Sequence, residues 1–100
     1  MNNSLEYKEI RGWILRVLYN NLPEWVGDKL MTEILTQGGY KVNTPSVQGH
    51  FRYLEEKGYL EVKETEISEL GLARTLAKLT SKGVDLVEGN LPDDPGIERK

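Results

Sequence analysis

The chain has 100 residues, of which 38% are hydrophobic and 29% are charged, and its formal charge at pH 7 is -3. A chain of this size can bury one modest hydrophobic core, so we expect a single domain. It contains no cysteine and one histidine, which excludes disulfides, a thiolate nucleophile and a cysteine-containing zinc site.

The first predicted helix runs from Leu5 to about Asn20, and Asn3 and Glu6 are spaced like a capping box at its start. At about 100° per residue, one broad apolar face is predicted to enter the core: Tyr7, Ile10, Trp13, Ile14, Val17 and Leu18. A second stripe of apolar or small residues lies almost opposite: Leu5, Gly12, Leu15 and Tyr19. A helix that is apolar on two faces is buried on both. The second stripe is covered either by the C-terminal part of the same chain or by a dimer partner.

The segment 21–28 contains proline and glycine, and it is predicted to be a loop that holds at most one helical turn. Asp28 is expected to cap a second helix that ends at Gly38 and Gly39. The residues of this helix that are predicted to face inward are Leu30, Met31, Ile34 and Leu35.

The stretch TPSVQGHFRYLEEKG predicts a sharply bounded third helix over residues 45–57. Thr44 can act as the N-cap, Pro45 suits the first helical position, and Gly58 can adopt the left-handed conformation that ends a helix. His50 lies at the edge of the buried side, where we expect a half-buried, hydrogen-bonded histidine. The buried side itself is predicted to consist of Val47, Phe51 and Leu54.

Two strands are predicted after the third helix, over residues 59–64 and 72–79, because both segments alternate and carry β-favouring residues. The segment TEISELG between them is expected to be a loop longer than a tight hairpin turn.

Thr80 or Ser81 then opens a short helix that ends at Gly89. We therefore expect one domain over residues 1–89. The remaining residues, 90–100, are predicted to form an irregular tail that is anchored by Leu91 or Ile97.

Three short helices followed by a β-hairpin is the element order of a winged helix-turn-helix. The segment TPSVQGHFRYLEEKGYLEV resembles the recognition helix and first wing strand of transcription regulators of the MarR, PadR and ArsR type. LAKLTSKGVDLVEG resembles their second wing strand and the helix after it, which opens with a Leu-Thr-x-x-Gly signature. DLVEGNLPDDPGIERK is similar, to a lesser degree, to the ends of small winged-helix proteins of Mu-like prophages. The expected fold is therefore α+β, a winged helix-turn-helix with a three-helix core, a two-stranded β-hairpin wing and a short C-terminal helix.

This resemblance implies a homodimeric DNA-binding protein that regulates transcription, with helix 45–57 in the major groove and the wing on the phosphate backbone. Glutamine and arginine can bond adenine and guanine edges, and hydroxyl and ammonium groups can contact phosphates. The residues expected to bind double-stranded DNA are Lys41, Thr44, Ser46, Gln48, Arg52, Lys63 and Arg74. The residues expected at the dimer interface are those of the second stripe, Leu5, Gly12, Leu15 and Tyr19.

Two features favour a different use of the same fold. Gly49 lies in the middle of the exposed side of helix 45–57 and offers no side chain to read a base, although it could permit close backbone approach. Residues 59–79 carry four acidic and three basic groups, so the wing would repel phosphates. The alternative function is a protein-interaction module in a phage or prophage context, without DNA binding.

No catalytic or metal-binding site is predicted. His50 has no second histidine or cysteine with which to form one, and the chain has no glycine-rich phosphate loop. We therefore expect a protein that is not an enzyme and needs no cofactor. The sequence also lacks an apolar run of about 18 residues and a basic-plus-apolar leader, so we expect no membrane partner and a cytoplasmic location.

Overall fold

The computed structural model describes the backbone of residues 3–100, and their side chains apart from those of residues 67 and 68. This part of the chain is α+β and follows the predicted order of helices and strands, with one additional strand after the first helix. The first two residues of the expected domain lie outside the described residues. The elements are α1 (Ser4–Asn20), β1 (Val26–Gly27), α2 (Asp28–Gln37), α3 (Thr44–Glu56), β2 (Leu60–Ile67), a 3-10 turn (Ser68–Leu70), β3 (Leu72–Leu79) and α4 (Ser81–Val87).

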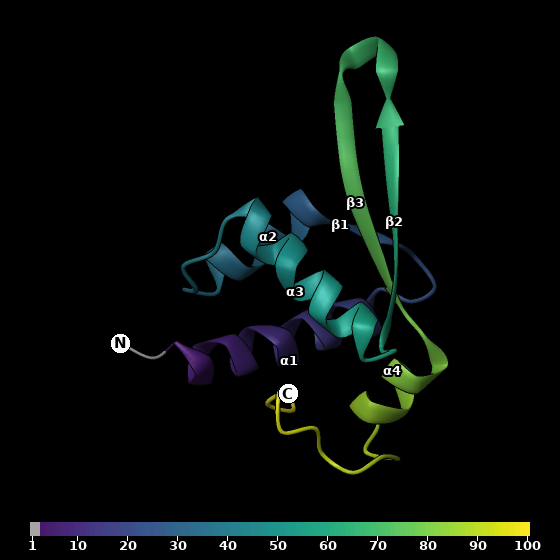
Figure 1. The fold of residues 1–100 in the computed structure, drawn as a ribbon. Coiled ribbons are helices and arrows are strands. Elements are labelled where there is room, and N and C mark those ends of the chain that lie inside the picture. Colours follow the sequence, from purple (N-terminus) through teal and green to yellow (C-terminus); the bar gives the residue numbers. More distant parts are fainter. Residues whose placement is uncertain (1–2) are drawn as a thin grey trace.

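The helices gather at one end of the molecule, and the β2–β3 hairpin projects from them as a long ribbon, which we call the wing (Figure 1). The strand order is β1-β3-β2, and β3 pairs antiparallel with both neighbours. Within the wing, the register runs from Leu60 opposite Leu79 to Ile67 opposite Leu72. Much of the predicted loop TEISELG is therefore strand, because Thr65 and Ile67 are β-branched and continue the ladder.

The core lies where the helices meet the base of the wing. Val47, Phe51 and Leu54 of α3 are each 0% exposed, which confirms the predicted buried side of this helix. They belong to a cluster of buried residues that draws on every helix and on the sheet: Ile10, Ile14, Leu15, Leu18, Val26, Met31, Leu35, Tyr59, Leu60, Ala77, Leu79, Leu86, Val87 and Ile97.

Three residues predicted to face the core are instead partly exposed. Tyr7 and Trp13, on the edges of the broad apolar face of α1, are 42% and 39% exposed. Each covers a polar neighbour: the Tyr7 ring meets His50 edge-on at 5.4 Å, and the Trp13 indole N–H donates to the Tyr40 hydroxyl at 3.1 Å. Leu30 is 52% exposed, because the side of α2 that faces the core carries Asp28, Met31 and Leu35.

The third helix begins one residue earlier than predicted, and its N-cap is Asn43 instead of Thr44. The Asn43 side chain accepts a hydrogen bond from the Ser46 amide at 2.8 Å, and the Asn43 amide donates to the Ser46 hydroxyl at 3.1 Å. This reciprocal pair is a capping box, and it places Thr44 inside the first turn beside Pro45. Gly58 ends the helix with φ of +85°, as predicted.

Two other predicted caps differ from the structure. Asn3 is the N-cap residue of α1, as predicted, but its side chain makes no capping hydrogen bond, so the predicted capping box is absent. Asp28 lies in the first turn of α2, after the extended residue Gly27, which is the N-cap. The Thr80 cap of α4 is confirmed, since its side chain accepts from the Gly83 amide at 3.1 Å.

The additional strand, β1, lies within the predicted loop 21–28. Val26 pairs with Ala77 and Gly27 with Leu76, so β1 extends the base of the wing. A strand of two residues has no periodicity that a sequence pattern could detect.

The tail has no regular structure and is anchored by Ile97, which belongs to the core, and both features were predicted. It also packs along α1. The Glu98 amide donates to the Lys8 carbonyl oxygen at 3.0 Å. Arg16 donates twice to the carbonyl oxygen of Lys100, at 2.6 and 3.1 Å. The tail therefore belongs to the same folded unit as the helices.

Asp94 fixes the start of this packed segment. Its carboxylate accepts from the Lys57 ammonium at 2.7 Å, the Tyr59 hydroxyl at 2.8 Å and the Gly96 amide at 2.8 Å. Burial by itself would raise the pKa of Asp94, but these hydrogen bonds outweigh burial and hold the pKa below its usual value. The carboxylate thus joins the tail to the end of α3 and the start of β2.

The tail covers the middle of the stripe that was expected to form a dimer interface, at Gly12 and Leu15. Leu15 is 2% exposed, and a Cβ atom at Gly12 would overlap the carbonyl oxygen of Glu98. The expected dimer contacts at Gly12 and Leu15 are therefore wrong, because the same chain already buries both residues. Tyr19 is half-buried and donates to the Glu88 carboxylate at 2.7 Å, while Leu5 is 67% exposed.

Replacing Phe51 with alanine should lower the free energy of unfolding by about 3–5 kcal/mol, because the change removes a large side chain from the centre of the core. Denaturant titration would measure the loss. Glu56→Ala on the exposed side of the same helix is the control, and it should change the free energy by less than about 0.5 kcal/mol. A loss below about 1 kcal/mol for Phe51→Ala would contradict the packing of α3.

A matched pair of glycine substitutions tests the position of the tail. Gly12→Ala should lower the free energy of unfolding by about 1–3 kcal/mol, because the new methyl group displaces the backbone of Glu98. Gly49→Ala, also in the middle of a helix but with open space around it, should raise it by about 0.5–1 kcal/mol. Thermal and chemical unfolding would measure both. An equal increase in the free energy of unfolding in both variants would show that the tail does not lie on α1.

Candidate nucleic-acid interface

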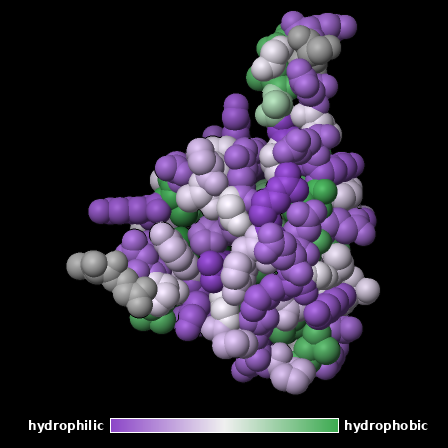
Figure 2. Space-filling view, viewed as in Figure 1, coloured by the Kyte–Doolittle hydropathy of each residue, from purple (hydrophilic) through white to green (hydrophobic). Residues whose placement is uncertain are grey.

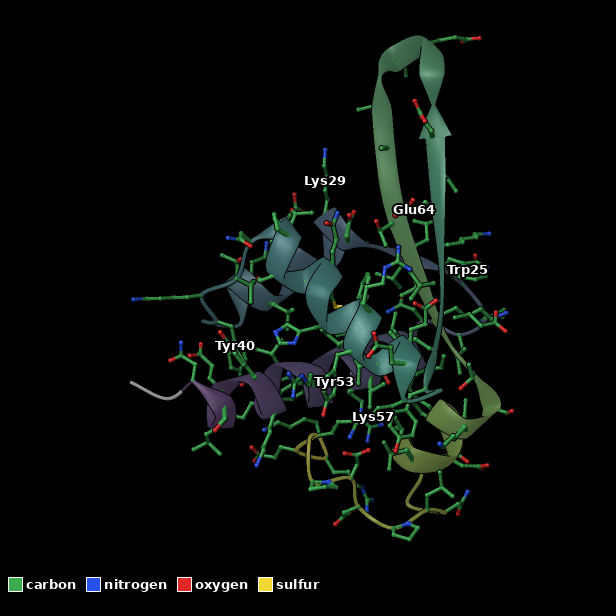
Figure 3. The ribbon with its side chains drawn as sticks, in the orientation of Figure 1. Trp25, Lys29, Tyr40, Tyr53, Lys57 and Glu64 are labelled. Carbon is green, nitrogen blue, oxygen red and sulfur yellow. The ribbon has the colours of Figure 1, made fainter. Side chains whose placement is uncertain are left out.

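The exposed side of α3 lies beside the base of the wing (Figure 3). In a recognition helix, the N-terminal half meets the base edges. In this half of α3, Pro45, Ser46 and Gly49 are exposed. No atom outside the helix lies within 4 Å of the position where a Cβ of Gly49 would stand. Another molecule could therefore approach the backbone of this turn closely.

The Gln48 side chain is already held by another residue. Its amide nitrogen donates to one carboxylate oxygen of Asp28 at 2.7 Å, and the other oxygen accepts from the Lys29 amide at 2.8 Å. Asp28 is 2% exposed, so this bond satisfies a buried carboxylate. Gln48 is thus half-buried and links α3 to the start of α2.

Arg52 is paired with two carboxylates on the surface. Its guanidinium lies 3.2 Å from Glu55 on α3 and 3.0 Å from Glu64 on the wing. The Glu64 side chain is 72% exposed, and an ion pair so open to water contributes only about 0–1 kcal/mol. Arg52 can therefore exchange these partners for another at little cost.

The remaining expected DNA contacts fall into two groups. Lys41, Thr44 and Ser46 lie in or before the first turn of α3, where the Ser46 hydroxyl is engaged in the capping box. Lys63 and Arg74 lie on the wing, and Arg74 borders a cavity that Gln48 also lines. The expected phosphate contacts thus come from two separate segments of the chain.

The strand register gives the wing two different faces. The inner face continues the buried base of the sheet and carries Val62, Glu64, Glu66, Ala73, Thr75 and Ala77. The outer face carries Glu61, Lys63, Thr65, Arg74, Leu76 and Lys78. Figure 3 shows Glu64 on the side of the wing that faces α3 and Trp25 on the opposite side. Glu64 and Glu66 thus lie on the face toward α3 and Lys63 lies on the opposite face, whereas Arg74, nearer the tip, also borders the space between the wing and α3.

A polar cavity of about 330 Å³ lies between α3 and the distal wing. It is lined by Gln48 from the helix and by wing residues from both faces: Glu64, Thr65, Glu66, Ala73, Arg74 and Thr75. Beyond this cavity the wing is in solvent, and Figure 2 shows hydrophobic surface near its tip, where Leu70 is 69% exposed.

Trp25 is a surface residue that the sequence analysis did not select. It immediately precedes β1, and the pairing of β1 with β3 brings its ring against the outer face. The Lys63 ammonium lies 4.1 Å from the centre of the ring and the Lys78 ammonium 5.9 Å from it, so both make cation–π contacts. In the sequence, the one feature that could have drawn attention to Trp25 is a large aromatic residue in a predicted loop that contains proline and glycine, directly before Val26.

His50 takes part in packing between α3 and α1. It is 7% exposed, and its Nδ1 atom accepts a hydrogen bond from Arg11 at 3.2 Å. The Arg11 guanidinium also stacks 3.7 Å from the centre of the Tyr53 ring. Burial, reinforced by the charge of Arg11, lowers the pKa of His50 to about 4, so the ring is neutral at pH 7.

Over residues 3–100, excluding the undescribed side chains, no three histidine or acidic side chains are grouped so that they could hold a metal ion. No helix in the same range is long and apolar enough to cross a membrane. Neither a protein-family model nor a curated protein sequence matches this chain.

Acidification should destabilise the protein through His50. The folded pKa lies below the unfolded value, so between about pH 6.5 and pH 4 the unfolded chain binds a proton that the folded chain does not. Stability is therefore retained above pH 6.5 and falls by roughly 1–2 kcal/mol between pH 7 and pH 5.

Denaturant titrations at a series of pH values would measure this slope. His50→Gln keeps a hydrogen-bond acceptor for Arg11 but does not titrate, so its slope over the same range should be smaller. Parallel slopes in the two proteins would show that His50 does not carry the effect.

Proposed function

We propose that this protein is a winged-helix DNA-binding protein that acts in transcription, with α3 entering the major groove. The observation that supports this proposal is the uncovered N-terminal half of α3, with an open glycine turn at its centre and a projecting wing beside it. A major groove about 12 Å wide admits a helix of this kind.

The residues of α3 suit this role in different ways. Gly49 allows the helix backbone to approach the groove, and Arg52, almost one turn further on, can donate two hydrogen bonds to a guanine edge. To do so it must leave Glu55 and Glu64, which hold it weakly. Lys41, exposed before the helix, can contact a phosphate. Gln48 contributes indirectly by fixing α3 against Asp28.

A palindromic site would require a second copy of the chain. We propose such a homodimer only through surfaces that the tail leaves open, because Gly12 and Leu15 are already covered. Leu5 and Tyr7 near the start of α1 are 67% and 42% exposed and offer such a surface.

The second candidate function is binding to a basic protein segment. The observation that favours it is the pair of carboxylates, Glu64 and Glu66, in the wall of the polar cavity, which Arg74 also lines. Glu55 on α3 shares the guanidinium of Arg52 with Glu64. A lysine- or arginine-rich segment would complement this surface, which would repel phosphates.

Substitutions at the Arg52–Glu64 pair separate these two functions. If α3 binds DNA, Glu64→Gln should tighten duplex binding, because it removes a repulsive charge and releases Arg52. Arg52→Ala should reduce discrimination at one base pair by about 1–3 kcal/mol. Lys41→Ala should weaken binding to all sequences similarly. Binding to randomised and selected duplexes, followed by fluorescence anisotropy, would measure these effects.

Asp93→Asn makes the same charge change as Glu64→Gln in the distant tail and is the control. A wild-type protein that binds no duplex at about 50 mM salt and micromolar concentration would overturn the DNA proposal. Binding of a lysine-rich peptide that is weakened by Glu64→Gln would then support the protein-interaction function.

A further inference from the structure

β2 is an edge strand of the sheet. Among the described residues the strand order is β1-β3-β2, so one side of β2 pairs with β3 and the other side pairs with no strand. In Figure 1 the projecting part of β2 has no other element beside it on that side, and residues 63–66 are exposed. An edge strand carries unpaired backbone N–H and C=O groups, and a further strand can pair with them. The wing therefore has an open edge in addition to its two faces.

A hydrogen bond at the base of the wing shows which residues present their backbone groups at this edge. The Thr80 amide donates to the Tyr59 carbonyl oxygen at 3.0 Å, and these residues are directly opposite each other where the register of β2 and β3 ends. In an antiparallel ladder, opposite residues alternate between pairs that exchange hydrogen bonds and pairs that do not. The residues whose N–H and C=O groups point toward the open edge are therefore Val62, Glu64 and Glu66.

The side chains of these residues make the edge acidic on the inner face. Glu64 is held by its exposed ion pair with Arg52, and none of the ion pairs between described residues involves Glu66. Arg74, which also lines the cavity, is on β3 and therefore one strand further from the edge. A strand added beside β2 would place its own side chains about 5 Å from Val62, Glu64 and Glu66. Basic residues at alternate positions of that strand would complement the glutamates.

A second copy of the chain would not complement this edge. A two-fold axis through Glu64 would place this residue opposite its own copy, and an axis through Thr65 would place Glu64 opposite Glu66. An axis through Lys63 would bring two lysines together. Like charges directly opposite each other destabilise a strand pair, and charged residues on an edge strand are a common protection against self-association. The distal edge therefore requires a partner with a different sequence.

We infer that the open edge of β2 binds an extended segment of another protein as an additional strand, with basic side chains opposite Glu64 and Glu66. Main-chain hydrogen bonds supply affinity in such complexes, and alternate side chains supply specificity. The partner segment has lysine or arginine at every second position, followed by an apolar residue where it meets Val62. For the class of partner this inference rests on the second candidate function, and it adds the mode of binding. It does not require duplex binding by α3.

A matched pair of substitutions tests the main-chain pairing. Glu64→Pro and Glu64→Gln remove the same charge, but only proline removes the N–H that faces the edge, and neither change removes a hydrogen bond to β3. The probe is a short labelled peptide in which lysine and threonine alternate, and fluorescence anisotropy measures its binding. Glu64→Pro should bind this peptide about tenfold more weakly than Glu64→Gln does.

Ala73→Pro is the control for the opposite edge of the ribbon. By the same alternation, the N–H of Ala73 points away from β2, at a position of β3 that β1 does not reach. This variant should bind the peptide as tightly as the wild type. Circular dichroism and denaturant titration would confirm that each variant is folded.

Hydrogen exchange gives a second readout. The amides of Glu64 and Glu66 should become protected when the alternating peptide binds, because they gain a hydrogen-bond partner. The Thr65 amide already belongs to the ladder with β3 and should change less. Protection that alternates along β2 would therefore report an added strand.

The outcomes distinguish this inference from the second candidate function. Equal binding by Glu64→Pro and Glu64→Gln, or equal binding of a peptide with its lysines clustered at one end, would overturn the inference alone, because the glutamates would then act by charge. Loss of binding in Ala73→Pro would overturn it as well, since the peptide would then pair with β3. Self-association that Glu64→Pro abolishes would show that the edge pairs with a second copy. A wild-type protein that binds no basic peptide at micromolar concentration would overturn both.

Discussion

The burial of one side of α3 is the constraint on which the rest of the structure depends. Phe51 and its neighbours Val47 and Leu54 are fully covered, and the elements that cover them come from both ends of the chain. Because the core buries this side of α3, the opposite side of the helix faces solvent and the base of the wing. The position of the candidate interface is thus a consequence of core packing.

The sequence predicts most of this arrangement where the determining signals are local. Pro45 and Gly58 define α3 to within one residue, and Thr80 defines the start of α4, because caps and turns act over a few residues. The capping residue of α3 was misplaced because Asn43 and Thr44 are both good caps, and the choice depends on the reciprocal bond with Ser46.

The sequence fails where contacts join distant parts of the chain. The second apolar stripe of α1 correctly indicated a second burial, but the pattern could not say that Glu98 and Ile97 provide it. Gln48 is a second example. Its amide group could bond a base edge, but in the structure it bonds Asp28, and this contact depends on how α2 and α3 pack. The two faces of the wing can be assigned only once the strand register is known, because a count of charges in residues 59–79 does not say which side chains share a face.

The length of the wing also has a consequence for motion. A two-stranded ribbon with water on both faces is marginally stable by itself, and beyond Glu64 and Thr75 the wing relies mainly on its own ladder. Its distal amides should therefore exchange with solvent through local opening, while those near Leu60 and Leu79 exchange only when the core opens. A molecule that binds the distal ribbon would hold it in one shape, and part of the interaction free energy would offset the lost conformational entropy. Hydrogen-exchange protection that spreads toward the tip would then report binding even where no atom of the ligand is in contact.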